Sequence, residues 1–126
     1  MSAPPPSFCI AVVGSRTFTY YDHLATTLDR IIADDCPAGA VITIVSGGAA
    51  GADRLAARYA RARGLTLVEL VPEWHRYGRA AAIVRNGDIV ERADLVVAFW
   101  DGASPGTRDS IDRAKAAGKR VVVFPF

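Results

Sequence analysis

The chain has 126 residues, a hydrophobic fraction of 51% and a formal net charge of +2 at pH 7. This length fits one domain with a single core, and the composition is that of a globular protein. No apolar run approaches the roughly 20 residues that a membrane helix requires, so we expect no membrane partner. So small a net charge does not by itself indicate nucleic acid as a partner.

The first seven residues, Met-Ser-Ala-Pro-Pro-Pro-Ser, lack the positive and apolar regions of a secretion signal. We therefore interpret residues 1–7 as a flexible proline-rich tail and residues 8–126 as the folded domain. The cysteines Cys9 and Cys36 form neither a metal-binding pattern nor a disulfide framework. Reduced thiols fit a cytoplasmic protein, so we predict cytoplasmic localisation, no metal and no cofactor.

Continuous apolar runs alternate with amphipathic segments along the chain. An unbroken apolar run is typical of a strand buried on both faces, and apolar spacings of three and four residues are typical of a helix. The predicted strands are residues 8–13, 41–45, 65–71, 94–100 and 120–124, and the predicted helices are residues 22–34, 52–63, 79–92 and 107–117. This alternation predicts a Rossmann-like three-layer α/β domain whose five mostly parallel strands have the order 3-2-1-4-5.

Loops rich in Gly, Ser and Asp follow the first, second and fourth predicted strands, at residues 14–16, 46–53 and 101–107. In the expected strand order these loops converge at the carboxyl edge of the sheet, where the strand order reverses and α/β domains bind ligands. We therefore predict a ligand crevice between them, and we include Gly14 and Asp101 among its binding residues.

The loop at residues 46–53 is a glycine-rich turn from a strand into a helix. Glycine has no Cβ, so backbone N–H groups in such a turn can surround an anion at the positive end of the helix. We expect Ser46, Gly47, Gly48 and Gly51 to hold a phosphate; alternatively, the glycines only permit a tight turn with positive φ. For Asp53 we favour capping of free helix N–H groups over binding of a ligand hydroxyl.

The other two loops offer polar side chains to the same crevice. Ser15 and Arg16 can supply a hydroxyl and a charge, although a surface ion pair would also explain Arg16. Gly106 and Thr107 open the last predicted helix and form a second candidate anion site, where the Thr107 hydroxyl either holds phosphate or caps the helix.

Further candidates lie on the third helix and after the fourth strand. Asn86 falls on an apolar helix side, where an unpaired amide is costly, so we expect it to hydrogen-bond a structural group or a ligand. Its neighbour Arg85 is the better candidate for reaching a phosphate or ribose. Trp100 can stack on a base, although core packing is the commoner role of tryptophan. Asp109 and Arg113 have the spacing of a surface ion pair.

Read together, these motifs resemble a known family. They are Gly14-Ser15-Arg16-x-Phe18, Gly47-Gly48-Ala49-x-Gly51-Ala52-Asp53, Trp74, Arg85-Asn86, Ala98-Phe99-Trp100-Asp101-Gly102 and Gly106-Thr107. The set resembles the YspA-like branch of the SLOG superfamily, which comprises Rossmann-like domains related to the Lonely Guy cytokinin-activating enzymes and to the DNA-processing protein DprA. The resemblance implies a nucleotide or nucleotide-sugar ligand and a homodimer.

One departure from the related enzymes bears on catalysis. Lonely Guy-type phosphoribohydrolases carry Gly-Gly-x-Gly-Thr-x-x-Glu, and Ser110 stands here at the position of the glutamate. Asp109 is one residue early, roughly 100° around a helix. A serine cannot stabilise an oxocarbenium-like centre as a carboxylate does. We therefore predict a nucleotide-binding sensor or regulatory module. The alternatives are an N-glycosidic hydrolase using Arg85 and Asp109, and a single-stranded DNA-binding protein.

Overall fold

The computed structural model describes residues 4–126, in which every strand pairing is parallel and the strand order is β3-β2-β1-β4-β5. The elements are β1 (Ser7–Gly14), α1 (Tyr21–Asp35), β2 (Val41–Ser46), α2 (Ala52–Arg63), β3 (Thr66–Glu69), α3 (Trp74–Tyr77), the 3-10 helix η1 (Gly78–Ala80), α4 (Ala81–Arg92), β4 (Leu95–Trp100), α5 (Pro105–Ala116) and β5 (Arg120–Pro125). The predicted α/β class and strand order are confirmed.

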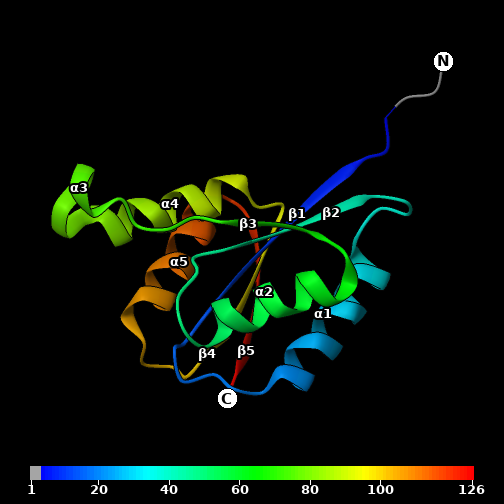
Figure 1. The fold of residues 1–126 in the computed structure, drawn as a ribbon, viewed down its shortest axis with the longest axis horizontal. Coiled ribbons are helices and arrows are strands. Elements are labelled where there is room, and N and C mark those ends of the chain that lie inside the picture. The colour runs from blue at the N-terminus through cyan, green and yellow to red at the C-terminus, as the bar shows by residue number, and fades with distance from the viewer. Residues whose placement is uncertain (1–3) are drawn as a thin grey trace.

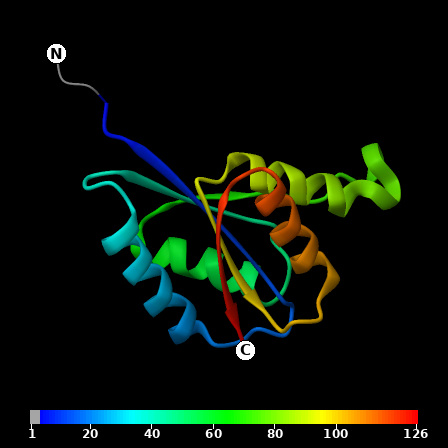
Figure 2. The same ribbon diagram turned by 180° about the vertical axis from the view of Figure 1, so that it is seen from behind.

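Two helices cover each face of the sheet. Figures 1 and 2 show α1 and α2 on one face and α4 and α5 on the other. Alternate residues of β1 serve the two cores: Ile10 and Val12 pack on the α1–α2 side, whereas Ala11 and Val13 pack on the α4–α5 side. Burial on both faces explains why this strand is one continuous apolar run. Within residues 4–126, no helix is both long and apolar enough to cross a membrane.

The ends of several elements differ from the sequence-based prediction. Ser7, predicted as tail, belongs to β1, whereas residues 1–3 of that tail lie outside the described part of the chain. β3 ends at Glu69 because its last partner, Ser46, is the final residue of β2. α5 begins at Pro105, two residues early, since the first helical turn tolerates proline.

The segment after β3 contains structure that the sequence did not reveal. Trp74–Tyr77 forms the short helix α3, which projects at one end of the molecule (Figure 1). The Gly78 N–H donates to the Trp74 carbonyl, and the positive φ of Gly78 (56°) ends α3. The chain then continues through η1, so α4 starts at Ala81 rather than at residue 79.

Two predicted ligand-binding glycines have a packing role. Gly51 has φ 79° and ψ −131°, and an added Cβ would fall on the Ser15 carbonyl oxygen and within 2.5 Å of the Arg16 carbonyl oxygen. A Cβ on Gly14 would lie 2.5 Å from the Ala52 Cβ. The glycine turn therefore packs directly on the loop after β1, and the tight-turn interpretation accounts for Gly51.

Replacing Gly51 with alanine tests this packing. Gly51→Ala adds both strain in a glycine-only backbone region and overlap with two carbonyls, so we expect a loss of about 3 kcal/mol in unfolding free energy. Gly39→Ala is the matched control, because Gly39 also has positive φ (72°) but open space around it; it should cost only about 1 kcal/mol. Urea denaturation of both variants measures the difference, and equal losses would contradict the packing argument.

Candidate functional site

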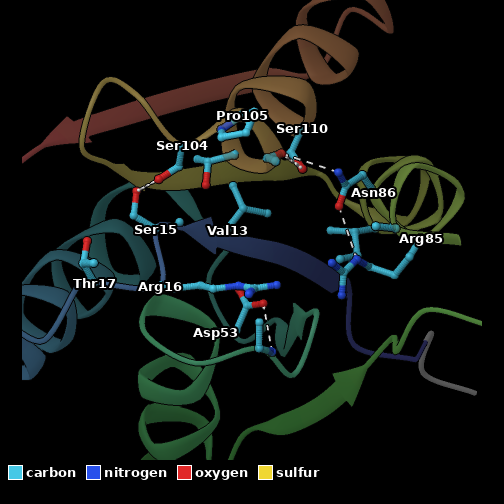
Figure 3. A pocket seen from close by; sticks show the side chains of 16 residues that line it. Val13, Ser15, Arg16, Thr17, Asp53, Arg85, Asn86, Ser104, Pro105 and Ser110 are labelled. Carbon is cyan, nitrogen blue, oxygen red and sulfur yellow. Dashed lines mark hydrogen bonds between the residues drawn. The ribbon is translucent and has the colours of Figure 1, made fainter. Parts of the chain in front are cut away.

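A cleft of about 350 Å³ lies beyond the carboxyl end of β1, between the start of α2 and the helices α4 and α5 (Figure 3). Its lining residues come from four segments of the chain: Val13, Gly14, Ser15, Arg16, Thr17, Ala49, Asp53, Ala82, Arg85, Asn86, Ile89, Ser104, Pro105, Gly106, Thr107 and Ser110. The cleft lies where the strand order reverses, between β1 and β4, as expected for this topology.

The structure brings part of the predicted site together in this cleft. The candidates that line it are Gly14, Ser15, Arg16, Asp53, Arg85, Asn86, Gly106 and Thr107. The candidates that do not line it are Ser46, Gly47, Gly48, Gly51, Trp100, Asp101 and Asp109. Sequence reasoning did not name Thr17 or Ser104 as binding residues, although Ser104 lies in a predicted crevice loop and Thr17 directly follows another. It had no signal for apolar lining residues such as Ile89.

The carboxylate of Asp53 binds the glycine turn to which it belongs. Its side chain is 8% exposed, and its Oδ2 accepts the Ala49 N–H at 3.2 Å. α2 begins after Gly51 without a side-chain cap, so the predicted helix-capping role of Asp53 is wrong. The carboxylate instead binds the turn itself, and a Cβ on Gly47 would lie 2.9 Å from its Oδ2. The protein's own anion thus occupies the turn that the sequence assigned to a phosphate.

Burial raises the pKa of Asp53 from 3.8 to about 6, although the Ala49 N–H and the charge of Arg85 oppose this shift. A buried carboxyl group that lines a cleft and has a pKa raised toward neutrality is a candidate functional group. Arg16 and Arg85 are the other charged residues of the cleft lining, so its charge favours an anionic ligand.

A chain of hydrogen bonds fixes Arg85 in the cleft wall. Its Nη1 donates to the Gly47 carbonyl at 2.9 Å, and its Nε donates to the Asn86 Oδ1 at 3.2 Å. Asn86 in turn donates through Nδ2 to the Asp109 Oδ2 at 3.0 Å. The expected Asp109–Arg113 pair is confirmed, with 2.8 Å between Oδ2 and Nε. Asp109 therefore anchors Asn86 and lies outside the cleft lining, contrary to its predicted catalytic position.

The start of α5 is open toward the cleft. Ser104 occupies the N-cap position, but its hydroxyl bonds to Ser15 Oγ at 2.9 Å and to the Asp101 carboxylate, and it does not cap the helix. Pro105 has no N–H. The N–H groups of Gly106 and Thr107 have no hydrogen-bond partner among residues 4–126. Two backbone donors and the buried Thr107 side chain thus border the cleft.

Trp100 and Asp101 shape the loop before α5. Trp100 Nε1 donates to the Ser104 carbonyl at 3.0 Å, and its ring packs on the α4–α5 core, so the predicted base-stacking role is not supported. Asp101 accepts the N–H groups of Ser104 and Ala103 at 2.8 and 2.9 Å. These bonds lower the pKa of Asp101 to about 2. Both side chains therefore hold the loop rather than face the cleft.

Comparison with known proteins identifies the family. The family model of the YspA, cpYpsA-related SLOG proteins matches residues 8–77. The chain belongs to this SLOG family. The Gene 61 protein of Mycobacterium phage D29 is 36% identical to this SLOG domain over 125 residues, covering 91% of the chain and 94% of the phage protein.

Two solved structures share the fold of this SLOG domain. DNA processing protein A from Helicobacter pylori, which binds single-stranded DNA, superposes with a TM-score of 0.70 and 24% identity over 96% of the chain. DprA from Streptococcus pneumoniae gives a TM-score of 0.70 and 21% identity over 97% of the chain. The SLOG domain spans only 66% and 51% of these two proteins, respectively.

The buried carboxyl group of Asp53 predicts a pH dependence of stability. Its folded pKa of about 6 exceeds the ordinary 3.8, so the stability it contributes is present below pH 3.8 and is lost as the pH rises through 6. Each pKa unit corresponds to about 1.4 kcal/mol. Relative to Asp53→Asn, the wild type should therefore lose about 2 kcal/mol between pH 4 and pH 7. Urea denaturation at both pH values checks this, and parallel stabilities of the two proteins would contradict it.

Proposed function

We propose that the cleft binds a nucleotide or nucleotide-derived ligand, with a phosphate at the start of α5, and that the protein acts as a sensor or regulatory module. The observation that carries this proposal is the uncapped start of α5. There the N–H groups of Gly106 and Thr107, which have no hydrogen-bond partner within residues 4–126, border a cleft that also contains Arg85. Unpaired N–H groups at a helix start, together with a guanidinium, are the donors that a phosphate accepts best.

The dimensions and walls of the cleft support a ligand of this class. A volume of about 350 Å³ lies at the lower end of the range for small-molecule sites. The lining divides into apolar residues, such as Val13 and Ile89, and charged residues, such as Arg16 and Asp53. A nucleotide has both a charged phosphate end and a largely apolar ring, so it matches this division.

The polar groups of the cleft favour binding over N-glycosidic hydrolysis. Ser110, at the position of the Lonely Guy glutamate, lines the cleft and donates its hydroxyl to the Gly106 carbonyl at 3.3 Å. Asp109 is held by Asn86 and Arg113. Among the described residues that line the cleft, Asp53 carries the remaining carboxyl group, and this group accepts a hydrogen bond from the glycine turn. A hydrolase of this type needs a carboxylate free to meet the sugar.

A thermal shift experiment with AMP tests the proposal, with adenosine as the control ligand that lacks the phosphate. A ligand that binds only the native state raises the melting temperature, by several degrees at about 100 times its Kd. We expect this rise with AMP and a much smaller rise with adenosine. A flat response to AMP, ADP-ribose and NAD would contradict the proposal.

Variants locate the phosphate within the cleft. Thr107→Val keeps the side-chain shape but removes the hydroxyl, and a lost hydrogen bond to a charged group lowers AMP affinity about tenfold or more. Arg85→Gln should weaken AMP by a similar factor, whereas Arg79→Gln, which changes an exposed arginine of η1, should leave it unchanged. Calorimetric titration gives the Kd values. Wild-type affinity in Thr107→Val and Arg85→Gln would place the phosphate elsewhere.

Two further measurements address the alternatives. Incubation with AMP followed by chromatography tests for released adenine, and release that disappears in Arg85→Ala would favour a hydrolase. The DprA-like fold makes single-stranded DNA the other candidate ligand. Binding of DNA through arginines should weaken steeply with salt. Tight, salt-dependent binding of an oligonucleotide without binding of AMP would favour that function.

A further inference from the structure

A second hollow lies beside the cleft, where α1 begins and β5 ends. This groove has a volume of about 820 Å³ and is lined by Thr19, Tyr20, Tyr21, Asp22, His23, Arg58, Pro125 and Phe126. None of these residues lines the cleft, and no sequence motif singled them out. Figures 1 and 2 both show the end of β5 beside the chain that leads into α1.

The groove presents aromatic rings that are exposed and yet fixed in place. Tyr20 and Phe126, which both line the groove, are 59% and 41% exposed. Both rings pack edge-on against the fully buried Phe18, with centroid distances of 5.7 and 4.9 Å. Phe18 in turn lies 4.8 Å from the buried Phe99. Contact with the buried rings thus supports an exposed stacking surface, which lowers the ordering cost of binding a ligand there.

Arg58 adds a planar cation to this surface. Its guanidinium carbon lies 3.8 Å from the centroid of the Tyr21 ring. Among the residues that the structure describes, no carboxylate forms an ion pair with Arg58. A stacked guanidinium offers a second flat face to an aromatic ligand. Asp22 also lines the groove and offsets the charge of Arg58. Aromatic stacking, rather than a net positive charge, is therefore what the groove offers a ligand.

The groove and the cleft share one short loop. Thr17 lines the cleft and Thr19 lines the groove, two residues further along the chain. Two residues of extended chain span at most about 7 Å. The linings of the two hollows therefore approach each other at this loop.

We propose that the groove stacks the second base of a ligand made of two nucleotide units joined through phosphate, the first unit lying in the cleft. This inference rests on the proposed function of the cleft and adds the size class of its ligand. Tyr20 and Phe126 supply the rings, and Arg58 supplies the flat cation. A base stacked on an aromatic side chain accounts for such a surface beside a nucleotide site, because every base offers an aromatic face.

Two probes that differ by one base test the proposal. Diadenosine 5′,5′-diphosphate is ADP-ribose with a second adenine, and AMP occupies the cleft alone. Base–aromatic stacking contributes about tenfold or more in affinity, so diadenosine diphosphate should bind at least about tenfold more tightly than ADP-ribose. The 5′-phosphorylated dinucleotide pdApdA, compared with dAMP, tests whether a strand of nucleic acid provides the second base instead.

Variants of the groove supply the matched comparison. Tyr20→Ala should remove the preference for diadenosine diphosphate over ADP-ribose while the Kd of AMP stays unchanged, and Tyr20→Phe should retain the preference. Trp74→Ala is the control, because Trp74 is 57% exposed on α3 and lies outside both hollows. The melting temperature of each variant reports that the fold is intact.

The outcomes separate the two proposals. Suppose that AMP binds, but that diadenosine diphosphate has the same Kd as ADP-ribose, and pdApdA has the same Kd as dAMP. If Tyr20→Ala also changes neither comparison, the groove proposal is overturned and the cleft proposal stands. If no probe binds, both are overturned. A gain seen only with pdApdA assigns the second base to a nucleic acid strand, and a gain only with diadenosine diphosphate assigns it to a dinucleotide.

Discussion

The candidate site depends on the hydrogen bonds of a single residue, Ser15. Its N–H donates to the Phe99 carbonyl at 2.9 Å, and its carbonyl accepts the Ala52 N–H at 3.3 Å. Its hydroxyl accepts the Asp101 N–H at 3.2 Å and bonds to the Ser104 hydroxyl. Ser15 is 1% exposed, so these bonds are shielded from water. Ser15 therefore holds the loops after β1, β2 and β4 together around one cleft. The glycines in these loops permit their close approach.

The fold was predictable because its signals are local and agree with one another. The apolar run of β1 continues through both core faces, and the helix α2 was predicted with its observed bounds, Ala52–Arg63. The helix ends at Gly64, whose left-handed conformation (φ 66°) lets its N–H bond to the last turn. By contrast, α3 has only four residues, and so short a helix carries no periodic pattern.

The site was predictable only in part, because hydrogen-bond partners far apart in sequence decide which polar group faces the cleft. The sequence predicts that the glycine turn holds a phosphate, but in the structure Asp53 accepts the Ala49 N–H there. The sequence likewise makes Asp109 a catalytic candidate, but in the structure Asn86, 23 residues away, donates a hydrogen bond to its carboxylate. The Gly106–Thr107 motif does lie in the first turn of α5 and lines the cleft, and within residues 4–126 neither N–H group has a hydrogen-bond partner.

Asp53 also makes the cleft responsive to protons. Its carboxyl group is buried in the lining of the cleft proposed to hold an anionic ligand, and burial raises its pKa to about 6. A second negative charge nearby favours the neutral form of a carboxyl group. Arrival of an anion in the cleft would therefore be accompanied by uptake of a proton at Asp53. Occupancy of the cleft would then depend on both ligand concentration and pH. The glycine turn would link these two quantities, because the carboxyl group of Asp53 is bound to it.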